Sequence, residues 1–295
     1  MVLFFIYDEF TDNADGDGAR AYAKLVMDVL RNPHMKRPEG ESKLGEITQQ
    51  FWLRAITVAS EPAQRRFIAS FASYVYGVID EASDRTRGYV RGITDFLELR
   101  RLTAGAHASF FSVELGLDIP DEVIEHPALE SLVSLAADST VLTNVRTLVY
   151  RLMQSSDSLG CWDQDLYSFN NEQAAGHGGH NIITVVMNEK GVNLDSALKW
   201  VGDYHEQVLS RFKAQRHRLP SWGLDMDVVV NTFVERLAYW IRGHDCWSFE
   251  SGRYFGLKGP EIKKQRLVTL LPRVAQPGVT PMMAPSLVEF GHCMA

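Results

Sequence analysis

The spacing of apolar residues limits most strongly what this chain can fold into. Stripes in which apolar residues recur every three to five positions lie at residues 21–30, 47–56, 67–79, 129–136, 197–212 and 229–240. A further helix is expected over residues 89–103. An α-helix repeats every 3.6 residues and a strand every two, so this spacing favours helices. The sequence also lacks sustained apolar–polar alternation. It therefore predicts an all-α helical bundle in a single domain over residues 1–276, followed by a disordered tail at 277–295.

The net charge, the apolar runs and the cysteines of the sequence argue against several classes of function. The net charge of −7 argues against sequence-independent binding of nucleic acid, which needs a basic surface. No run approaches the roughly 18 apolar residues of a membrane span, and the apolar start lacks a basic flank, so we expect a cytoplasmic protein without a membrane anchor. Cys161, Cys246 and Cys293 show neither a CxxC spacing nor an even-numbered framework, which predicts neither a zinc site nor a disulfide scaffold. A monomer and a homodimer are both compatible with the sequence.

Three carboxylates follow an aromatic run close to the start of the sequence. Asp8, Glu9 and Asp12 come directly after the segment 4–7, Phe-Phe-Ile-Tyr. On a helix, Asp8 and Asp12 project from one face because they are four residues apart. Such a pair suits Mg²⁺, which uses one or two protein carboxylates and leaves its other positions to water and substrate phosphates. The alternative interpretation is a solvated acidic helix end.

Two later segments offer matching chemistry. Ser168 and Glu172 are also four residues apart, and a hydroxyl with a carboxylate can chelate a second Mg²⁺. Arg253 and Tyr254 provide a guanidinium fork and a phenol for phosphate oxygens. The pair Arg100–Arg101 near a helix end adds further positive charge, although surface salt bridges would explain it equally well.

Taken together, these motifs resemble the class I terpene synthases, most closely fungal sesquiterpene cyclases of the protoilludene-forming type, over roughly residues 2–272. The family's aspartate-rich motif corresponds to residues 8–12, and its terminal Arg-Tyr motif to Arg253–Tyr254. Arg100 or Arg101, followed by residues 103–105, resembles the diphosphate-sensing arginine and the helix break behind it. The resemblance implies a class I terpenoid synthase bundle that ionises farnesyl diphosphate, cyclises the carbocation and uses about three Mg²⁺ ions.

The family's second metal motif is interrupted in this sequence. It reads Asn-Asp-Leu-x-Ser-x-x-x-Glu, and Gln164 stands where its asparagine would precede Ser168 by four residues. Joining Asn144 to Asp165 restores the motif, so we hypothesise that residues 145–164 are a retained intron or an insertion. Two alternatives remain open: the apolar spacing within 145–152 also fits a genuine turn of helix, and Gln164 could serve as the ligand through its amide oxygen.

The resemblance assigns a role to each group of residues. It implies catalytic roles for Asp8, Arg253 and Tyr254, and diphosphate contacts from Arg100, Arg101, Arg253 and Tyr254. The metal ligands that it implies are Asp8, Glu9, Asp12, Asn144 or Gln164, Ser168 and Glu172. The candidates for the pocket wall are Phe4, Phe5, Tyr7, Phe51, Phe71 and Trp247, each of which could equally be a packed core residue.

This sequence departs from the family pattern in two further respects. Asn171 stands where the family usually has a lysine, and Asp8 comes so early that the chain is expected to lack the family's N-terminal helices. Three alternatives to an active cyclase follow: an inactive chain derived from such an enzyme, a non-enzymatic helical interaction protein, and a prenyl chain-elongating synthase. The last would show two aspartate-rich motifs, whereas one occurs here.

Overall fold

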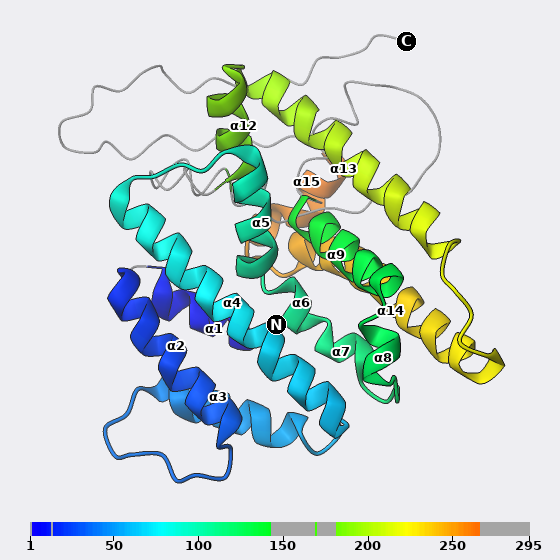
Figure 1. Ribbon diagram of the computed structural model, residues 1–295. Coiled ribbons are helices and arrows are strands. Elements are labelled where there is room, and N and C mark those ends of the chain that lie inside the picture. Colours follow the sequence, from blue (N-terminus) through cyan, green and yellow to red (C-terminus); the bar gives the residue numbers. More distant parts are fainter. Residues whose placement is uncertain (1, 13, 143–168, 170–180, 266–295) are drawn as a thin grey trace. The chain divides into compact units, whose positions relative to one another are not determined.

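The regular structure of the chain is helical. A computed structural model describes residues 2–12, 14–142, 169 and 181–265 (Figure 1). Within these residues the elements are α1 (Val2–Thr11), α2 (Gly16–Arg31), α3 (Lys43–Ala55), α4 (Glu61–Arg87), α5 (Ile93–Thr103), α6 (Ala106–Ser109), α7 (Phe111–Glu114), α8 (Asp121–Ile124), α9 (Pro127–Leu142), α12 (Ile182–Lys190), α13 (Leu194–Arg216), α14 (Leu224–Glu250), the 3₁₀-helix η2 (Gly256–Lys258) and α15 (Gly259–Gln265). The prediction of an all-α protein is confirmed.

Several helices have boundaries that differ from those that the apolar spacing indicated, and α5 and α14 are two examples. The helix expected from residue 89 begins at Ile93, because Gly88 adopts a left-handed conformation with φ 63° and ends α4. The amide of Tyr89 then donates to the carbonyl of Asp84, which closes the last turn of α4. The long helix around residues 229–240 extends to Leu224 and Glu250, beyond the apolar stripe at both ends.

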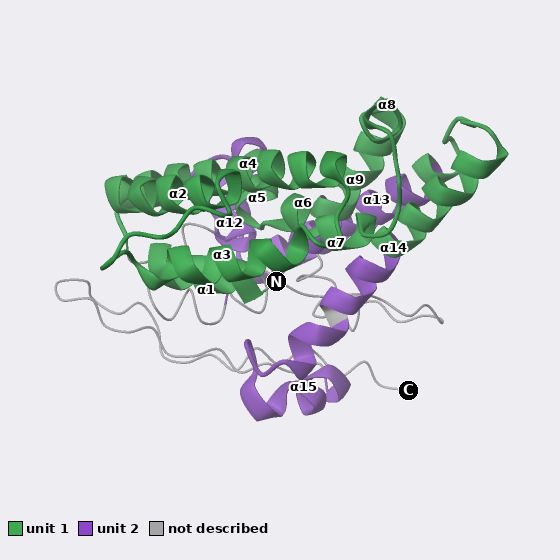
Figure 2. Cartoon of the chain, turned by 90° about the horizontal axis from the view of Figure 1, so that it is seen from below, with its two compact units in different colours: residues 1–89, 98–137, 215–237 green, residues 90–97, 138–214, 238–295 purple. Residues whose placement is uncertain are grey.

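The described residues form two compact units (Figure 2). Unit 1 comprises residues 1–89, 98–137 and 215–237, and unit 2 comprises residues 90–97, 138–214 and 238–295. In unit 1, α2 packs against α3 and α4, and α4 also contacts α6 and α7. Local sequence sets where these helices start: the side chains of Asp15, Ser42 and Ser60 each accept a hydrogen bond from a first-turn amide. Such caps satisfy amides that have no partner within the helix.

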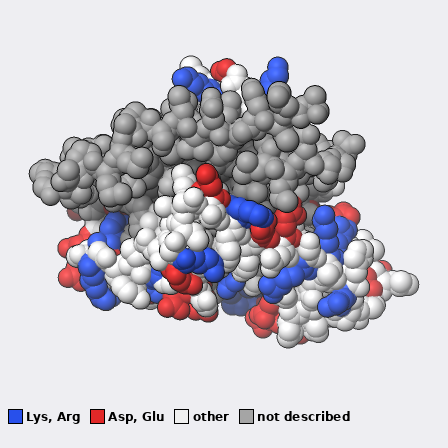
Figure 3. Space-filling model, turned by 90° about the horizontal axis from the view of Figure 1, so that it is seen from above, with Lys and Arg blue, Asp and Glu red and all other residues white. Residues whose placement is uncertain are grey.

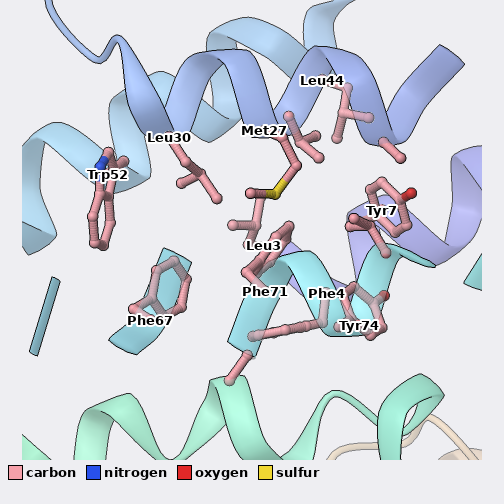
Figure 4. Close-up of a cluster of buried hydrophobic side chains, with 14 of the residues drawn as sticks. Leu3, Phe4, Tyr7, Met27, Leu30, Leu44, Trp52, Phe67, Phe71 and Tyr74 are labelled. Carbon is pink, nitrogen blue, oxygen red and sulfur yellow. The ribbon is translucent and has the colours of Figure 1, made fainter. Parts of the chain in front are cut away.

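An aromatic cluster forms the core of unit 1 (Figure 4). Phe4 and Tyr7 of α1 meet Phe71 and Tyr74 of α4, with ring centroids 5.2–6.4 Å apart. Trp52 of α3 extends the cluster towards Phe67 and Phe111. Full burial of one such side chain stabilises the fold by about 1.5–3 kcal/mol. The helix that carries the acidic motif is therefore attached to α4 mainly through its aromatic residues.

Charged groups in unit 1 attach the segment around α7 and α8 to α4. The guanidinium of Arg66 forms ion pairs with Glu114 and Asp121, and it also donates to the carbonyl of Ile119 at 3.2 Å. Glu114 is buried, so its negative charge needs this partner. Arg236 of α14 donates to the carbonyl of Val113 at 3.0 Å and thereby joins the same segment.

Unit 2 has its own buried contacts. Ser139 of α9 and the Nε2 atom of His205 in α13 lie 3.1 Å apart, and both side chains are fully buried. The carboxylate of Glu189 in α12 accepts a hydrogen bond of 2.5 Å from the amide of Ile93, which begins α5. Later in the chain, Gly259 packs so closely against Phe249 that a Cβ atom would overlap the carbonyl oxygen of Phe249. Only glycine fits at that position.

The hydroxyl of Tyr7 yields a testable prediction about stability. It is buried in unit 1 and has no hydrogen-bond partner among the residues that the structure describes, although a buried polar group without a partner costs about 1–3 kcal/mol. Replacement by phenylalanine removes that cost and keeps the ring, so Tyr7→Phe should raise the free energy of unfolding by about 1 kcal/mol. Denaturant unfolding of Tyr7→Phe and Tyr74→Phe provides the comparison, because the hydroxyl of Tyr74 is hydrogen-bonded. A less stable Tyr7→Phe variant would contradict this account.

The buried ring of His244 leads to a prediction about how the stability of the fold depends on pH. Its ring is buried in unit 2, and burial lowers the pKa of His244 from 6.5 to about 4. Between these pH values the unfolded chain binds the proton and the folded chain does not, so this contribution to stability is complete above pH 6.5 and falls as pH decreases towards 4. The expected loss is up to about 3 kcal/mol. Unfolding curves at pH 7 and pH 4.5 should show a smaller loss in His244→Gln than in the parent, whereas exposed His34→Gln should match the parent.

Candidate functional site

The acidic motif spans the last turn of α1 and Asp12, the residue that follows the helix. The amide of Asp12 donates to the carbonyl of Asp8 at 2.7 Å, so the two carboxylates lie one helical turn apart on the same face, as predicted. Asp8 is half-buried, whereas Glu9 and Asp12 are exposed. The half-buried carboxylate of Asp8 therefore lies next to Tyr74 of the aromatic cluster.

Tyr74 of α4 makes the most direct contact with this motif. Its hydroxyl donates a hydrogen bond of 2.6 Å to the Oδ1 atom of Asp8. Burial and the negative charge of Asp8 raise the pKa of Tyr74 well above its usual value, so the phenol stays protonated and acts as a donor. In the sequence, Tyr74 stands out only as part of the helical stripe at 67–79, because nothing local links it to a side chain 66 positions earlier.

A second residue of α4 holds the chain directly after the motif. The Nη2 atom of Arg85 donates to the carbonyl oxygens of Thr11 at 3.1 Å and of Ala14 at 3.2 Å. Ser83 lies against the next turn, where a Cβ atom on Gly16 would approach its hydroxyl to 2.7 Å. The end of α1 and the start of α2 are therefore attached to one stretch of α4.

The two arginines of α5 lie in the last turn of that helix, which belongs to unit 1. Arg100 and Arg101 are both half-buried, and the Nη1 atom of Arg100 donates to the hydroxyl of Thr103 at 3.3 Å. The predicted helix break is present: α5 ends at Thr103, and Gly105 has a left-handed φ of 63°. A Cβ atom on Gly105 would lie 2.9 Å from the ring of Phe4, which is one turn before Asp8 on α1.

The turn that follows α5 also approaches α4. Gly77 follows Tyr74 by one turn of α4, and a Cβ atom at Gly77 would lie 2.9 Å from the Cβ atom of Leu102. Unit 1 therefore brings Asp8, the helix break after the arginines and α4 into a single packed region. This arrangement depends on two close approaches that only glycine allows.

The terminal Arg-Tyr motif lies in unit 2, between α14 and η2. Arg253 is exposed, and its guanidinium carbon lies 5.9 Å from the ring centroid of Tyr254. The Tyr254 ring stands perpendicular to Trp247 at 6.2 Å, and the Trp247 ring lies 5.9 Å from His244. The motif therefore belongs to an aromatic cluster in which one arginine covers a phenol ring.

The candidates for the pocket wall occupy different environments. Phe4, Tyr7 and Phe71 are buried in the aromatic core of unit 1. Phe51 packs at the edge of the same core and Phe5 is half-buried, while Trp247 belongs to the cluster in unit 2. Contact of these residues with a substrate stays a prediction.

Several predicted residues lie outside the part of the chain that the structure describes. They are Asn144, Gln164, Ser168, Glu172, the segment 145–164 and the tail 277–295. The second metal motif therefore stays a prediction.

The carboxylates of α1 fit a Mg²⁺ site by their chemistry. Among the described residues, no group of three or more His, Cys, Asp and Glu side chains is arranged to hold a metal ion. Mg²⁺ does not need such a group, since it typically binds one or two carboxylates and completes its shell with water and phosphate oxygens. Carboxylates that bind metals are usually themselves hydrogen-bonded, and Asp8 has such a bond from Tyr74. The donor set of Asp8 and Asp12 is therefore suitable.

The helices and the charged surface residues were also compared with what membrane and nucleic-acid binding would need. No described helix is both long enough and apolar enough to pass through a membrane. On the face shown in Figure 3, Lys and Arg side chains are interspersed with Asp and Glu side chains.

Comparison with known proteins adds independent information. A family model described as terpene synthase family 2, C-terminal metal binding, matches residues 1–144 and 146–211. Sesquiterpene synthase 14 of Postia placenta is 41% identical over 93% of this chain and 72% of its own length. A delta(6)-protoilludene synthase of Armillaria gallica is 40% identical over 99% of this chain and 78% of its own length.

Solved structures share the fold at lower identity. A linalool/nerolidol synthase from Streptomyces clavuligerus superposes with a TM-score of 0.69 at 19% identity, covering 83% of this chain and 78% of its own. An α-eudesmol synthase superposes with a TM-score of 0.66 at 22% identity, covering 85% of this chain and 77% of its own. These structures support the helical fold that the motifs implied.

Proposed function

The chain belongs to the terpene synthase family, and on that premise we propose that it is a sesquiterpene synthase acting on farnesyl diphosphate. Family membership makes the protein a terpene cyclase that binds divalent metal and uses a prenyl diphosphate substrate. The proposal adds that the metal is Mg²⁺, with about three ions per site, and that the products are a sesquiterpene hydrocarbon and diphosphate.

One observation carries this proposal: identity of about 40% over more than nine-tenths of the chain with proteins named as sesquiterpene or protoilludene synthases. A sesquiterpene has fifteen carbons, the length of a farnesyl chain, so the names of these relatives support farnesyl diphosphate as the substrate. The same observation favours an enzyme over the helical interaction protein that the sequence alone left open.

The carboxylates of the aspartate motif would bind Mg²⁺ next to the aromatic core. Mg²⁺ at this place supplies positive charge that offsets the charge developing on the departing diphosphate. Asp8 would be the main ligand, because Tyr74 holds one of its oxygens at 2.6 Å while a carboxylate offers about four lone-pair sites. Asp12 and Glu9 would support it from the exposed end of the helix.

Arginine and tyrosine side chains would bind the diphosphate directly. Arg100 or Arg101, with Arg253, offers guanidinium groups that can form paired hydrogen bonds to phosphate oxygens. The phenol of Tyr254 would donate one more. Such donors accelerate ionisation because their bonds strengthen as negative charge moves onto the leaving group.

Aromatic side chains would then guide the carbocation. Aromatic rings attract cations by their negative faces, and an apolar wall keeps water from adding to the cation. Phe4, Phe5, Tyr7, Phe51, Phe71 and Trp247 are the proposed sources of this wall.

The second metal group is proposed from sequence. Asn144 or Gln164, with Ser168 and Glu172, would bind a further Mg²⁺ ion. If Asn144 is the ligand, residues 145–164 would be a retained intron. If Gln164 is the ligand, that segment would be a genuine insertion.

A direct assay tests the function. The purified chain, incubated with farnesyl diphosphate and Mg²⁺, should release a sesquiterpene hydrocarbon that is detected in the headspace by gas chromatography and mass spectrometry. Chelation of Mg²⁺ should abolish the product, and geranyl and geranylgeranyl diphosphate should be turned over more slowly. Preference for one of these shorter or longer chains would contradict the proposed substrate.

A matched variant that lacks residues 145–164 distinguishes the two ligand assignments. Product from the shortened chain alone would assign Asn144 and support the retained intron. Product from the full chain would instead assign a role to Gln164 or to a rearranged Asn144. Absence of product from both variants would contradict the proposed function and favour the inactive-chain alternative.

A further inference from the structure

Helix α4 contacts the metal-binding end of α1 at two points that lie on one face. Tyr74 and Arg85 are 11 residues apart, and because each helical residue turns by about 100°, the two side chains leave α4 within about 20° of one another. Tyr74 contacts Asp8, and Arg85 contacts the main chain at Thr11 and Ala14. The acidic motif therefore lies between two fixed points about 16 Å apart along the axis of α4.

The first contact acts on the orientation of a side chain. Asp8 can rotate about two torsions, and a metal ligand must be held in one of the resulting positions. A hydrogen bond of 2.6 Å from a fully buried phenol favours a single carboxylate orientation. The ring of Tyr74 is itself held by Phe4 and Phe71, with centroids 5.2 Å and 5.4 Å away, so the donor cannot follow a moving carboxylate.

The second contact acts on the main chain. Helix ends fray because their last carbonyl groups have no partner within the helix. The guanidinium of Arg85 donates to the carbonyl of Thr11, the last residue of α1, and to that of Ala14 in the turn that follows. Asp12 lies between these two residues, so the bonds of Arg85 restrict the turn that carries it.

We propose that Tyr74 and Arg85 are positioning residues that preset the aspartate motif for Mg²⁺: Tyr74 orients the Asp8 carboxylate, and Arg85 fixes the turn that carries Asp12. This inference rests on the proposed function of the motif. Neither residue touches substrate; both act through the groups that bind the metal. Hydrogen-bond partners of metal ligands typically alter metal affinity by 10- to 100-fold when they are removed.

The test compares variants of α4 by calorimetric titration of inorganic diphosphate in the presence of Mg²⁺. Tyr74→Phe removes only the hydroxyl that bonds Asp8, and Tyr76→Phe is its control, because Tyr76 is on the same helix and is 60% exposed. Arg85→Ala removes the main-chain bonds, and Arg87→Ala, an exposed arginine two residues later, is its control. We expect Tyr74→Phe to weaken binding by 10- to 100-fold and Arg85→Ala by about tenfold, with both controls equal to the parent.

A kinetic readout separates positioning from a general loss of structure. In Tyr74→Phe, the Mg²⁺ concentration for half-maximal turnover should rise by 10- to 100-fold, while kcat at saturating Mg²⁺ should recover to within severalfold of the parent. A purely structural role would instead lower the unfolding midpoint without changing the Mg²⁺ requirement.

Asp8→Asn distinguishes the failure of this inference from the failure of the proposed function. If Asp8→Asn loses binding and Tyr74→Phe binds like Tyr76→Phe, the positioning role is overturned and the metal site stands. If Asp8→Asn binds Mg²⁺ and diphosphate as tightly as the parent, the assignment of the motif as a metal site is overturned, and the positioning role with it.

Discussion

Asp8→Asn should lower kcat/KM for farnesyl diphosphate by about 10³-fold at a fixed Mg²⁺ concentration. The substitution keeps the size of the side chain and its hydrogen-bonding oxygen but removes the negative charge that binds the cation. A metal that polarises a phosphoryl oxygen contributes several kcal/mol to transition-state stabilisation, and each 1.36 kcal/mol corresponds to a factor of ten in rate. Steady-state release of diphosphate is the measurement.

A matched surface variant serves as the control for this prediction. Asp17→Asn, in the first turn of α2, removes a carboxylate whose side chain is 95% exposed and whose ion pair with Arg20 spans 3.8 Å. Exposed pairs of this kind contribute little to stability, so Asp17→Asn should keep the parent rate. Equal activity of Asp8→Asn and Asp17→Asn would refute a catalytic role for the aspartate motif.

Arg253→Ala should lower kcat by about 10²–10³-fold, the range seen when one donor to a developing oxyanion is removed. In the described structure Arg253 is exposed and lies over the ring of Tyr254, where its guanidinium contributes little to the core. The variant should therefore unfold at the parent temperature while losing turnover. Thermal unfolding and diphosphate release, measured on the same preparations, test both halves of this statement.

Two companion variants define what Arg253 contributes. Lys258→Ala removes another exposed cation from the same segment and should leave turnover unchanged. Arg253→Lys keeps the charge but loses the planar fork that can form paired bonds to phosphate, so its rate should fall between those of the parent and Arg253→Ala. If Lys258→Ala and Arg253→Ala lose activity equally, general positive charge rather than a specific donor would explain the effect.

The sequence predicted some helix boundaries well and others poorly. Apolar spacing located the long helices because amphipathic stripes report directly on which face is buried. It misplaced the start of α5 because the left-handed turn at Gly88 depends on two hydrogen bonds that close α4. The apolar stripe also covered only part of α14. Both ends of that helix carry polar residues, and apolar periodicity does not distinguish them from loop residues.

In the candidate site, too, some residues could be identified from the sequence and others could not. Asp8, Asp12, the arginines of α5 and the Arg-Tyr pair could be identified from residue type and spacing. Tyr74 and Arg85 could not, since each contacts the motif across more than 60 positions of sequence. Aromatic and arginine residues at helical spacing are usually explained by packing or by surface charge, so nothing in their pattern distinguishes these two.

The sequence by itself determined the helical class, the acidic face of α1 and the chemistry available for a diphosphate, because these follow from side-chain type and from the period of one helix. Tertiary structure decided which hydroxyl donates to Asp8 and which guanidinium contacts the end of α1. It also decided that the hydroxyl of Tyr7 is buried without a hydrogen-bond partner among the described residues. The reason is physical: a hydrogen bond between two helices depends on their separation and rotation, which the packing of the whole core of unit 1 sets and no local pattern encodes.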